Sequence, residues 1–223
     1  MAPKLQERLS QQCEQRGLTL SAVQLAQLLQ YLELLLQWRR HLNLTGLHEA
    51  ERILDVLIVE SLDFLQHDLI PVAARVLDLG TGAGVPGIPL GICRPDVQVT
   101  LLDRSHKKMA FVRRTVALLR LPGCHPCCEA AETLARQGVS APRFEVVVAR
   151  GVGSVAQLLR LAEPLVQAGG KLLLRKPAAT PEIQEAAMLL QAGRWSTLHT
   201  LPLLDSGPSP WVLLAITRSV DEG

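Results

Sequence analysis

Residues 76–89, with the sequence VLDLGTGAGVPGIP, constrain the fold of this chain more than any other segment. A short apolar run carries one acid, Asp78, and four glycines follow within eight residues. A strand that turns through glycines into a helix presents backbone N–H groups and the positive end of the helix dipole to a polar or anionic ligand. The segment therefore predicts a strand, a ligand-binding loop and a helix, in that order.

The rest of the chain after Arg75 alternates between apolar strand segments and helical segments, which is typical of an α/β protein with a parallel sheet covered on both faces. The strand segments are residues 75–80, 97–103, 124–130, 144–150, 170–176 and 210–216. The last one follows LLDSGPSP, which is too short to hold a crossover helix, so we expect it to pair antiparallel.

The first 68 residues are expected to be helical. Ser21 and Gln24 form a potential capping box at the start of an amphipathic segment. The apolar face of that segment consists of Val23, Leu25, Leu28, Leu29, Leu32, Leu35 and Trp38. A further helix is expected from about residue 49 to 65. We therefore predict a helical N-terminal cap over residues 1–68 and a ligand-binding domain over residues 69–223, together forming one structural unit.

The composition limits the classes of protein to which this chain can belong. Hydrophobic residues make up 48% of the chain and charged residues 20%, as in ordinary globular proteins. The polar N-terminus and the interrupted apolar runs predict neither a secretory signal nor a membrane span. Five cysteines in such a chain suggest reduced thiols and a cytoplasmic location. The net charge is only +2, so nucleic-acid binding would require a local basic face.

Two cofactors compete for the glycine loop. Gly82, Gly84 and Gly87 satisfy the G-x-G-x-x-G pattern of dinucleotide-binding folds. However, Asp78 stands two residues before Gly80, and a carboxylate there suits the amino group and sulfonium of S-adenosylmethionine but would repel a pyrophosphate. A pair of C-terminal strands with the last one reversed also fits the class I (Rossmann-like) methyltransferase fold, which we predict here. A dinucleotide enzyme, or a glycine turn without a ligand, remains the alternative.

A second acid follows the next strand. Asp103 ends the segment VTLLD, about 20 residues after the glycines, where a carboxylate can accept hydrogen bonds from both ribose hydroxyls of either cofactor. Asp103 therefore supports a nucleoside ligand without identifying it.

Four segments of the chain resemble the bacterial RsmG (GidB, glucose-inhibited division protein B) methyltransferases. These segments are LLQWRRHLNLTG, LDLGTGAGVPGIPL, RPDVQVTLLDRSHKKMAFV and VVARGVGSV, and the resemblance runs from about residue 18 to 176. It implies transfer of a methyl group from S-adenosylmethionine to N7 of a guanine in the 530 loop of 16S rRNA. The implied partner is 16S rRNA or the small ribosomal subunit.

The resemblance also implies roles for individual residues. Gly80 and Val85 match cofactor contacts, Ala131 and Glu132 match the pair that holds the adenine, and Arg150 matches an arginine at the cofactor and target base. With the loop residues above, the expected cofactor-binding set is Asp78, Gly80, Gly82, Gly84, Val85, Asp103, Ala131, Glu132 and Arg150.

This chain departs from the family pattern at four positions. Val56 and Leu57 replace an Arg-His pair, Ala130 replaces an arginine, and Pro177 stands where a glycine is common. The lost cations raise two alternatives: a cofactor-binding homologue without rRNA activity, and a methyltransferase that acts on another RNA or a small molecule.

Guanine N7 is an unprotonated lone pair, so its methylation needs no general base. The Asn/Asp-Pro-Pro-aromatic motif of exocyclic-amine methylases is absent after the fourth strand segment, and Arg150 stands there instead. We expect Arg150 to be the catalytic residue, and its expected role is to orient the base. The alternative is an arginine held in a salt bridge.

Aromatic residues make up 3% of the chain, so RNA recognition should depend on shape and phosphates rather than on stacking. The expected RNA contacts are Arg39, Arg40, Asn43, Lys107, Lys108, Arg113, Arg114 and Lys176. A solvated helix face would explain each charge on its own.

Three other signals carry less weight. The run GCHPCC lacks a second pair of ligands, so no metal site is expected. Cys127, after Pro126, precedes the fourth strand segment and therefore is not expected to be a nucleophile. His41 and His106 are interpreted as surface residues. We expect a monomer.

Overall fold

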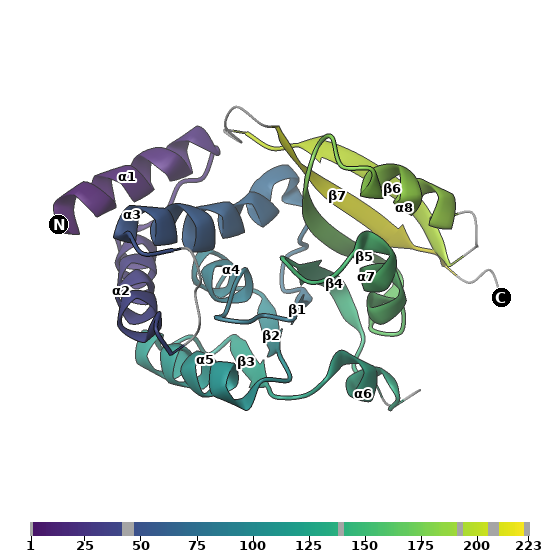
Figure 1. The fold of residues 1–223 in the computed structure, drawn as a ribbon, viewed down its shortest axis with the longest axis horizontal. Coiled ribbons are helices and arrows are strands. Elements are labelled where there is room, and N and C mark those ends of the chain that lie inside the picture. The colour runs from purple at the N-terminus through teal and green to yellow at the C-terminus, as the bar shows by residue number, and fades with distance from the viewer. Residues whose placement is uncertain (1, 42–46, 138–140, 191–193, 205–209, 221–223) are drawn as a thin grey trace.

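A seven-stranded sheet forms the centre of the computed structural model, which describes residues 2–41, 47–137, 141–190, 194–204 and 210–220 (Figure 1). The strands are β1 (Arg75–Leu79), β2 (Gln98–Leu102), β3 (Cys124–Cys127), β4 (Phe144–Ala149), β5 (Val166–Pro177), β6 (Trp195–Pro202) and β7 (Trp211–Arg218). Their order across the sheet is β3-β2-β1-β4-β5-β7-β6.

The strands from β3 to β5 are parallel, and β7 pairs antiparallel with both β5 and β6. The prediction of a mostly parallel sheet with a reversed last strand is therefore confirmed. β6 was not among the strand segments expected from the sequence. It lies at the edge of the sheet and most of its residues are exposed, so it lacks the apolar run that marks an interior strand.

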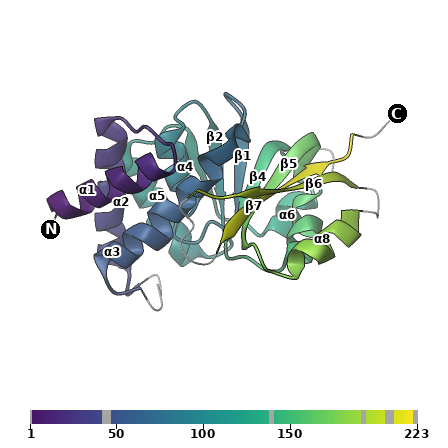
Figure 2. The same cartoon turned by 90° about the horizontal axis from the view of Figure 1, so that it is seen from above.

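Helices cover both faces of this sheet. They are α4 (Gly87–Cys93), α5 (His106–Leu119), α6 (Ala131–Ala135), α7 (Val155–Ala162) and α8 (Glu182–Leu190). Successive strand residues point to opposite faces, so Val76 and Val148 join a core with the cap, α4 and α5, whereas Leu77 and Val147 join a second core with α6, α7 and α8. Figure 2 shows these two groups of helices separated by the sheet.

The N-terminal cap begins with α1 (Ala2–Gln15) and α2 (Ala22–Trp38). Ser21 and Gln24 form the expected capping box at the start of α2. Gln24 and Gln27 also reach the sheet domain, where their amides donate to the carbonyls of Cys93 at 3.0 Å and Leu119 at 2.9 Å. Because the last carbonyls of a helix have no partner within it, these bonds complete the ends of α4 and α5 and fix the cap on the domain.

The next segment differs from the single regular helix expected over residues 49–65. It consists of α3 (Ala50–Ile53), a π-helical turn η1 (Leu54–Ile58) and a 3₁₀ segment η2 (Val59–Asp68) with a kink at Gln66 and His67. The carbonyl of Val56, within the π-helical turn, accepts a hydrogen bond from Arg150 after the end of β4. The prediction of one regular helix was wrong here, and a contact 94 residues away in sequence leaves no local sequence pattern.

Within the described residues, no helix is long and apolar enough to cross a membrane.

Candidate functional site

The glycine loop follows β1 and turns toward the end of β2. Gly80, Gly82 and Gly84 have positive φ values of +75°, +59° and +97°, as the glycine pattern suggested. The backbone N–H groups of Gly80 and Thr81 both donate to the carbonyl of Leu102 at 2.9 Å. The loop is thereby fixed to the carboxyl end of β2 before any ligand is present.

Asp78 lies under this loop and is fully buried. Its Oδ2 accepts hydrogen bonds from Thr81 Oγ1 at 2.5 Å and from the N–H of Gly87 at 2.8 Å. Burial raises the pKa of Asp78 to about 7, although these two hydrogen bonds act in the opposite direction. Oδ1 has no hydrogen-bond partner among the described residues.

The structure therefore gives Asp78 a different task from the direct ligand contact expected above. Its side chain lies on the same face of β1 as Val76, toward α4, and does not line the ligand cavity. It joins the start of the loop to the start of α4.

Gly84 also lies away from the cavity, contrary to expectation. A Cβ at this position would lie 2.3 Å from Ile88 Cδ1 and 3.3 Å from the hydroxyl of Tyr31. That hydroxyl, on α2, donates to the carbonyl of Ala83 at 2.8 Å. A glycine is favoured here by the positive φ and by the close packing of Ile88 of α4, with Tyr31 of the cap next nearest.

Asp103 lies at the end of β2 and faces the cavity, as expected. Its Oδ2 accepts from the N–H of Gly82 at 2.9 Å, and its Oδ1 accepts from the N–H of Ser105 at 2.8 Å. The carboxylate is thus held in a fixed orientation by two backbone donors, and half of its lone pairs remain for a ligand.

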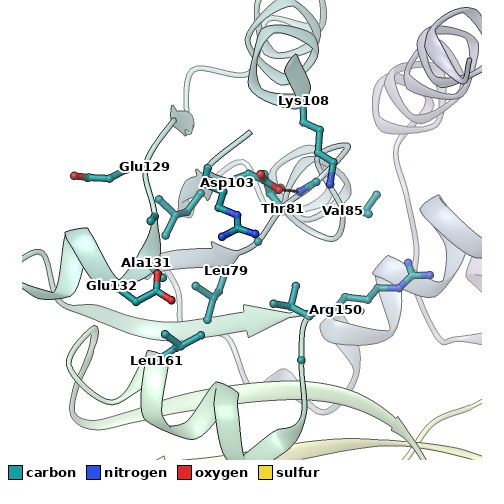
Figure 3. Close-up of a pocket in the computed structure, with 18 residues that line it drawn as sticks. Leu79, Thr81, Val85, Asp103, Lys108, Glu129, Ala131, Glu132, Arg150 and Leu161 are labelled. Carbon is teal, nitrogen blue, oxygen red and sulfur yellow. Dashed lines mark hydrogen bonds between the residues drawn. The ribbon is translucent and has the colours of Figure 1, made fainter. Parts of the chain in front are cut away.

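The glycine loop and the ends of the neighbouring strands enclose a cavity of about 580 Å³, which we call the glycine-loop cavity (Figure 3). Seven of the nine expected cofactor-binding residues line it: Gly80, Gly82, Val85, Asp103, Ala131, Glu132 and Arg150. Its volume is within the range of about 300 to 1,000 Å³ found for small-molecule sites. Glu132 and Ala131, in the first turn of α6, lie opposite Lys108, which extends from α5 toward Asp103 and Val85.

Several lining residues were not expected from the sequence. They are Leu79, Thr81, Leu102, Arg104, Glu129, Ala130, Gly151, Val152, Gly153 and Leu161. Gly151 and Gly153 both have positive φ values and form a second glycine turn after β4. The letters RGVGS could have indicated this turn, because two glycines follow a strand segment there as well.

Arg150 extends from the end of β4 away from the labelled residues of the glycine-loop cavity (Figure 3). Its guanidinium is held by Glu60 Oε2 at 2.8 Å, Ser61 Oγ at 3.2 Å and the carbonyl of Val56. Burial lowers the pKa of Arg150, and the attraction of Glu60 opposes this effect. The salt bridge with Glu60 that we considered as an alternative role is therefore present. Together, the three hydrogen bonds use three of the five N–H donors of the guanidinium.

A second cavity, of about 340 Å³, adjoins the first and shares Arg150, Gly151 and Val152 with it. We call it the second cavity. Its other lining residues are Glu60, Ala149, Leu158, Arg175, Lys176, Pro177, Thr180, Glu182 and Trp211. No sequence pattern predicted this cavity as a unit, because it combines η2, the ends of β4, β5 and β7, and the start of α8.

Charged side chains form a connected network behind the second cavity. Arg175 binds Asp63 at 2.6 Å and Glu60 at 3.1 Å, and its guanidinium lies 4.0 Å from the ring centroid of Trp211. Asp63 is 1% exposed and also binds Arg16, which directly follows α1, at 2.9 Å. The network therefore connects the end of the N-terminal helix to Arg150 through a chain of ion pairs.

The basic residues expected to contact RNA fall into two places. Arg113 and Arg114 are exposed on α5, as is Lys107 at its start. Trp38 at the end of α2 packs against Phe111 of α5 with ring centroids 5.7 Å apart, which places Arg39 and Arg40 beside that helix. We refer to Arg39, Arg40, Lys107, Lys108, Arg113 and Arg114 as the α5 basic cluster.

Two expected RNA contacts are not part of this cluster. Lys176 lines the second cavity, where it binds Glu182 at 2.8 Å and helps to lower the pKa of that carboxylate. Asn43 lies outside the residues that the structure describes.

Three of the four departures from the family pattern border the site. Val56 and Leu57 belong to η1, where Leu57 is buried and Val56 packs against the core. Ala130 lines the glycine-loop cavity, and Pro177 lines the second cavity. Three of the four therefore stand beside a cavity or Arg150: Val56 accepts from Arg150, and Ala130 and Pro177 line the two cavities.

Among the residues described, no cluster of three or more His, Cys, Asp or Glu side chains is arranged to hold a metal ion. Cys124 is buried, and burial raises the pKa of its thiol to about 12.

Comparison with known proteins relates this chain to one family. The family described as rRNA small subunit methyltransferase G (GidB) matches residues 24–202. Ribosomal RNA small subunit methyltransferase G from Moorella thermoacetica is 36% identical over 78% of this chain and 73% of its own length. The protein of that name from Syntrophotalea carbinolica is 35% identical over 84% of this chain and 85% of its own.

Solved structures at lower identity share the fold. The apo S-adenosylmethionine-dependent methyltransferase SibL superposes with a TM-score of 0.57 at 20% identity, covering 87% of this chain and 70% of its own. An S-adenosylmethionine-dependent O-methyltransferase from Thermotoga maritima gives a TM-score of 0.54 at 14% identity, covering 74% of this chain and 66% of its own.

Proposed function

This chain belongs to the rRNA small subunit methyltransferase G family, and on that premise we propose that it methylates N7 of a guanine in the 530 loop of 16S rRNA, with S-adenosylmethionine as the methyl donor. One observation supports the proposal most strongly. Two cavities, one suited to a nucleoside cofactor and one to a base, adjoin each other at Arg150, Gly151 and Val152. A methyl transfer requires that geometry, because donor and acceptor must be held in line.

The glycine-loop cavity is assigned to S-adenosylmethionine because the chain belongs to a methyltransferase family. Asp103 and Glu132 line the cavity, and an acid at the end of β2 can bind the ribose of either cofactor, so these carboxylates do not by themselves exclude a dinucleotide. Asp103 would accept hydrogen bonds from the ribose hydroxyls, and Ala131 with Glu132 would hold the adenine. Gly80 has room for no side chain, since a Cβ would lie 2.7 Å from a methyl group of Val152.

When bound, S-adenosylmethionine supplies a methyl group on a positively charged sulfur atom. Guanine N7 attacks through a lone pair and loses no proton, so this chain needs only to orient the base and to stabilise its charge. Arg150 has two N–H donors left after its three hydrogen bonds, and these could donate to guanine O6 beside N7. Arg150 is accordingly the residue that we assign to catalysis.

The target base would be flipped out of the RNA stack and enter the second cavity, as target bases are in other enzymes that modify them. The α5 basic cluster would bind phosphates around the mouth of the glycine-loop cavity, which Lys108 also lines. The proposed substrate also implies a cytoplasmic location, and we propose that the protein acts as a monomer.

The experiment that tests this function uses tritiated S-adenosylmethionine and small ribosomal subunits from a strain without the gene. The purified protein should transfer label to 16S rRNA, and digestion should yield 7-methylguanosine from the 530 loop. Retention of label by the protein without transfer would support a cofactor-binding homologue, and a different labelled nucleoside would identify another target.

A further inference from the structure

Glu60 differs from the other acid of the buried network in how many of its lone pairs are in use. Asp63 is enclosed and accepts from Arg16, Gln66 and Arg175 with its two oxygens. Glu60 receives both of its ion pairs on Oε2 alone, at 2.8 Å from Arg150 and 3.1 Å from Arg175. Its Oε1 has no partner among the described residues, and 26% of the side chain is exposed.

This carboxylate lines a cavity that an RNA base is proposed to enter. A carboxylate near a polyanion is unfavourable unless it accepts hydrogen bonds. Arg150 and Arg175 donate to Oε2, and Oε1 is left for a ligand that offers donors. Among the RNA purines, guanine presents N1–H and an N2 amino group side by side, whereas adenine has an unprotonated N1 and no N2 amino group. The free acceptor of Glu60 therefore matches guanine and not adenine.

The position of Glu60 relative to Arg150 is consistent with this match. The backbone of Arg150 lies where the two cavities meet, and its side chain extends across to Glu60. The distance from the junction to Glu60 is thus set by the length of an arginine side chain. In guanine, the distance from N7 to the edge that carries N1 and N2 is about the same length. N7 would therefore face the junction while the N1 and N2 edge meets Glu60.

We infer that Glu60 is the specificity residue of the second cavity, where its free carboxylate oxygen accepts hydrogen bonds from N1–H and N2–H of the target guanine. The inference rests on the proposed function, since it assigns the base that the proposed reaction methylates. Arg150 and Arg175 orient Glu60, and the buried pair of Arg175 and Asp63 fixes Arg175 from behind.

Inosine provides the test, because it differs from guanosine only by the absence of the N2 amino group and retains N1–H, O6 and N7. Small subunits would be reconstituted with 16S rRNA ligated to carry guanosine or inosine at the target position. For the wild-type protein, kcat/KM should fall roughly tenfold or more on inosine, the usual effect of removing a hydrogen bond to a charged group.

The variant Glu60→Gln should remove this discrimination. Its amide oxygen can still accept from the two arginines, but its amino group would then face the donors of guanine. The guanosine-to-inosine ratio should therefore approach one. Glu182→Gln provides the matched control, since Glu182 lines the same cavity but binds Lys176 and the N–H of Val155, and its ratio should remain that of the wild type.

A second measurement does not depend on activity. Saturation-transfer NMR should show stronger binding of GMP than of IMP to the wild-type protein, and a smaller difference for Glu60→Gln. Equal rates on guanosine and inosine subunits would overturn the assignment of Glu60 and leave the proposed function intact. No transfer to guanosine subunits by the wild-type protein would overturn both.

Discussion

The glycine-loop cavity and the second cavity meet at Arg150, yet different parts of the chain build them. Backbone groups of one loop and the acid at the end of β2 form part of the first, and the hydrogen bond that joins Gly82 to Asp103 spans only 21 residues. The second is formed by side chains that come together over long separations, such as Arg150 with Glu60, 90 residues apart, and Arg175 with Asp63, 112 residues apart. A ligand site made of backbone can be encoded in a short motif, whereas a site made of paired side chains depends on the whole fold.

The largest effect is expected for the substitution of Arg150, which would show that the two cavities have separate functions. Arg150→Ala should lower the rate of methyl transfer roughly 100- to 1,000-fold, the usual cost of removing one preorganised donor from an active site. The affinity for S-adenosylhomocysteine, measured by calorimetry, should stay close to the wild-type value because the guanidinium extends into the second cavity. Arg150→Lys should recover only part of the rate, since an ammonium lacks the planar fork. A normal rate in Arg150→Ala would contradict the assigned role.

Substitutions in the glycine loop should have the converse effect, which is weaker cofactor binding with unchanged RNA binding. Gly80→Ala and Gly82→Ala both place a side chain at positive φ, which costs about 1 to 2 kcal/mol. Only Gly80→Ala also brings a Cβ within 2.7 Å of Val152, whereas a Cβ at Gly82 would have its nearest neighbouring atom 3.9 Å away. We therefore expect roughly 100-fold weaker binding of S-adenosylhomocysteine for Gly80→Ala and roughly tenfold for Gly82→Ala.

Calorimetry would measure both affinities, and filter binding of small subunits without cofactor should remain unchanged in both variants. Equal losses in the two would show that backbone strain alone determines the effect.

A smaller effect is expected for Asp103→Asn. The variant keeps the shape of the side chain but removes the negative charge that faces the ligand and accepts from Gly82 and Ser105. Affinity for S-adenosylhomocysteine should fall roughly tenfold, as for loss of a charged hydrogen bond. Glu129→Gln is the control, because Glu129 borders the same cavity but points away from its other labelled residues (Figure 3), and its affinity should change little.

The smallest effect on ligand binding is expected at Asp78, where the readout is stability. The pKa of Asp78 is raised from 3.8 to about 7 in the folded protein, so the native state binds a proton that the unfolded state has already lost between these pH values. The contribution of Asp78 to stability is therefore present below about pH 4 and is lost as the pH rises toward 7.

Asp78→Asn cannot titrate, so the difference in the free energy of unfolding between wild type and variant should change across that window, in favour of the variant at higher pH. Urea unfolding at several pH values would measure it. A difference that stays constant from pH 4 to 7 would contradict the raised pKa.

Sequence patterns predicted the parts of the site that are local. The glycine loop, Asp103 and the reversed β7 follow from local patterns, whereas Ala131 and Glu132 came from the family resemblance; the loop glycines Gly80 and Gly82, Asp103, Ala131 and Glu132 line the same cavity. Asp78 and Gly84 do not line that cavity, because the pattern does not tell which face of β1 an acid occupies or which side chains pack against a loop glycine.

By itself, then, the sequence determined a methyltransferase-type α/β sheet, a glycine-loop site and membership of one family, since periodicity, turn chemistry and motif spacing are properties of contiguous residues. Only the tertiary structure decided the π-helical turn at Leu54–Ile58, the second cavity and the pairing of Glu60 with two arginines. These features depend on which buried charges meet after the chain has folded. That choice is governed by the need to pair each desolvated charge, and no local pattern records it.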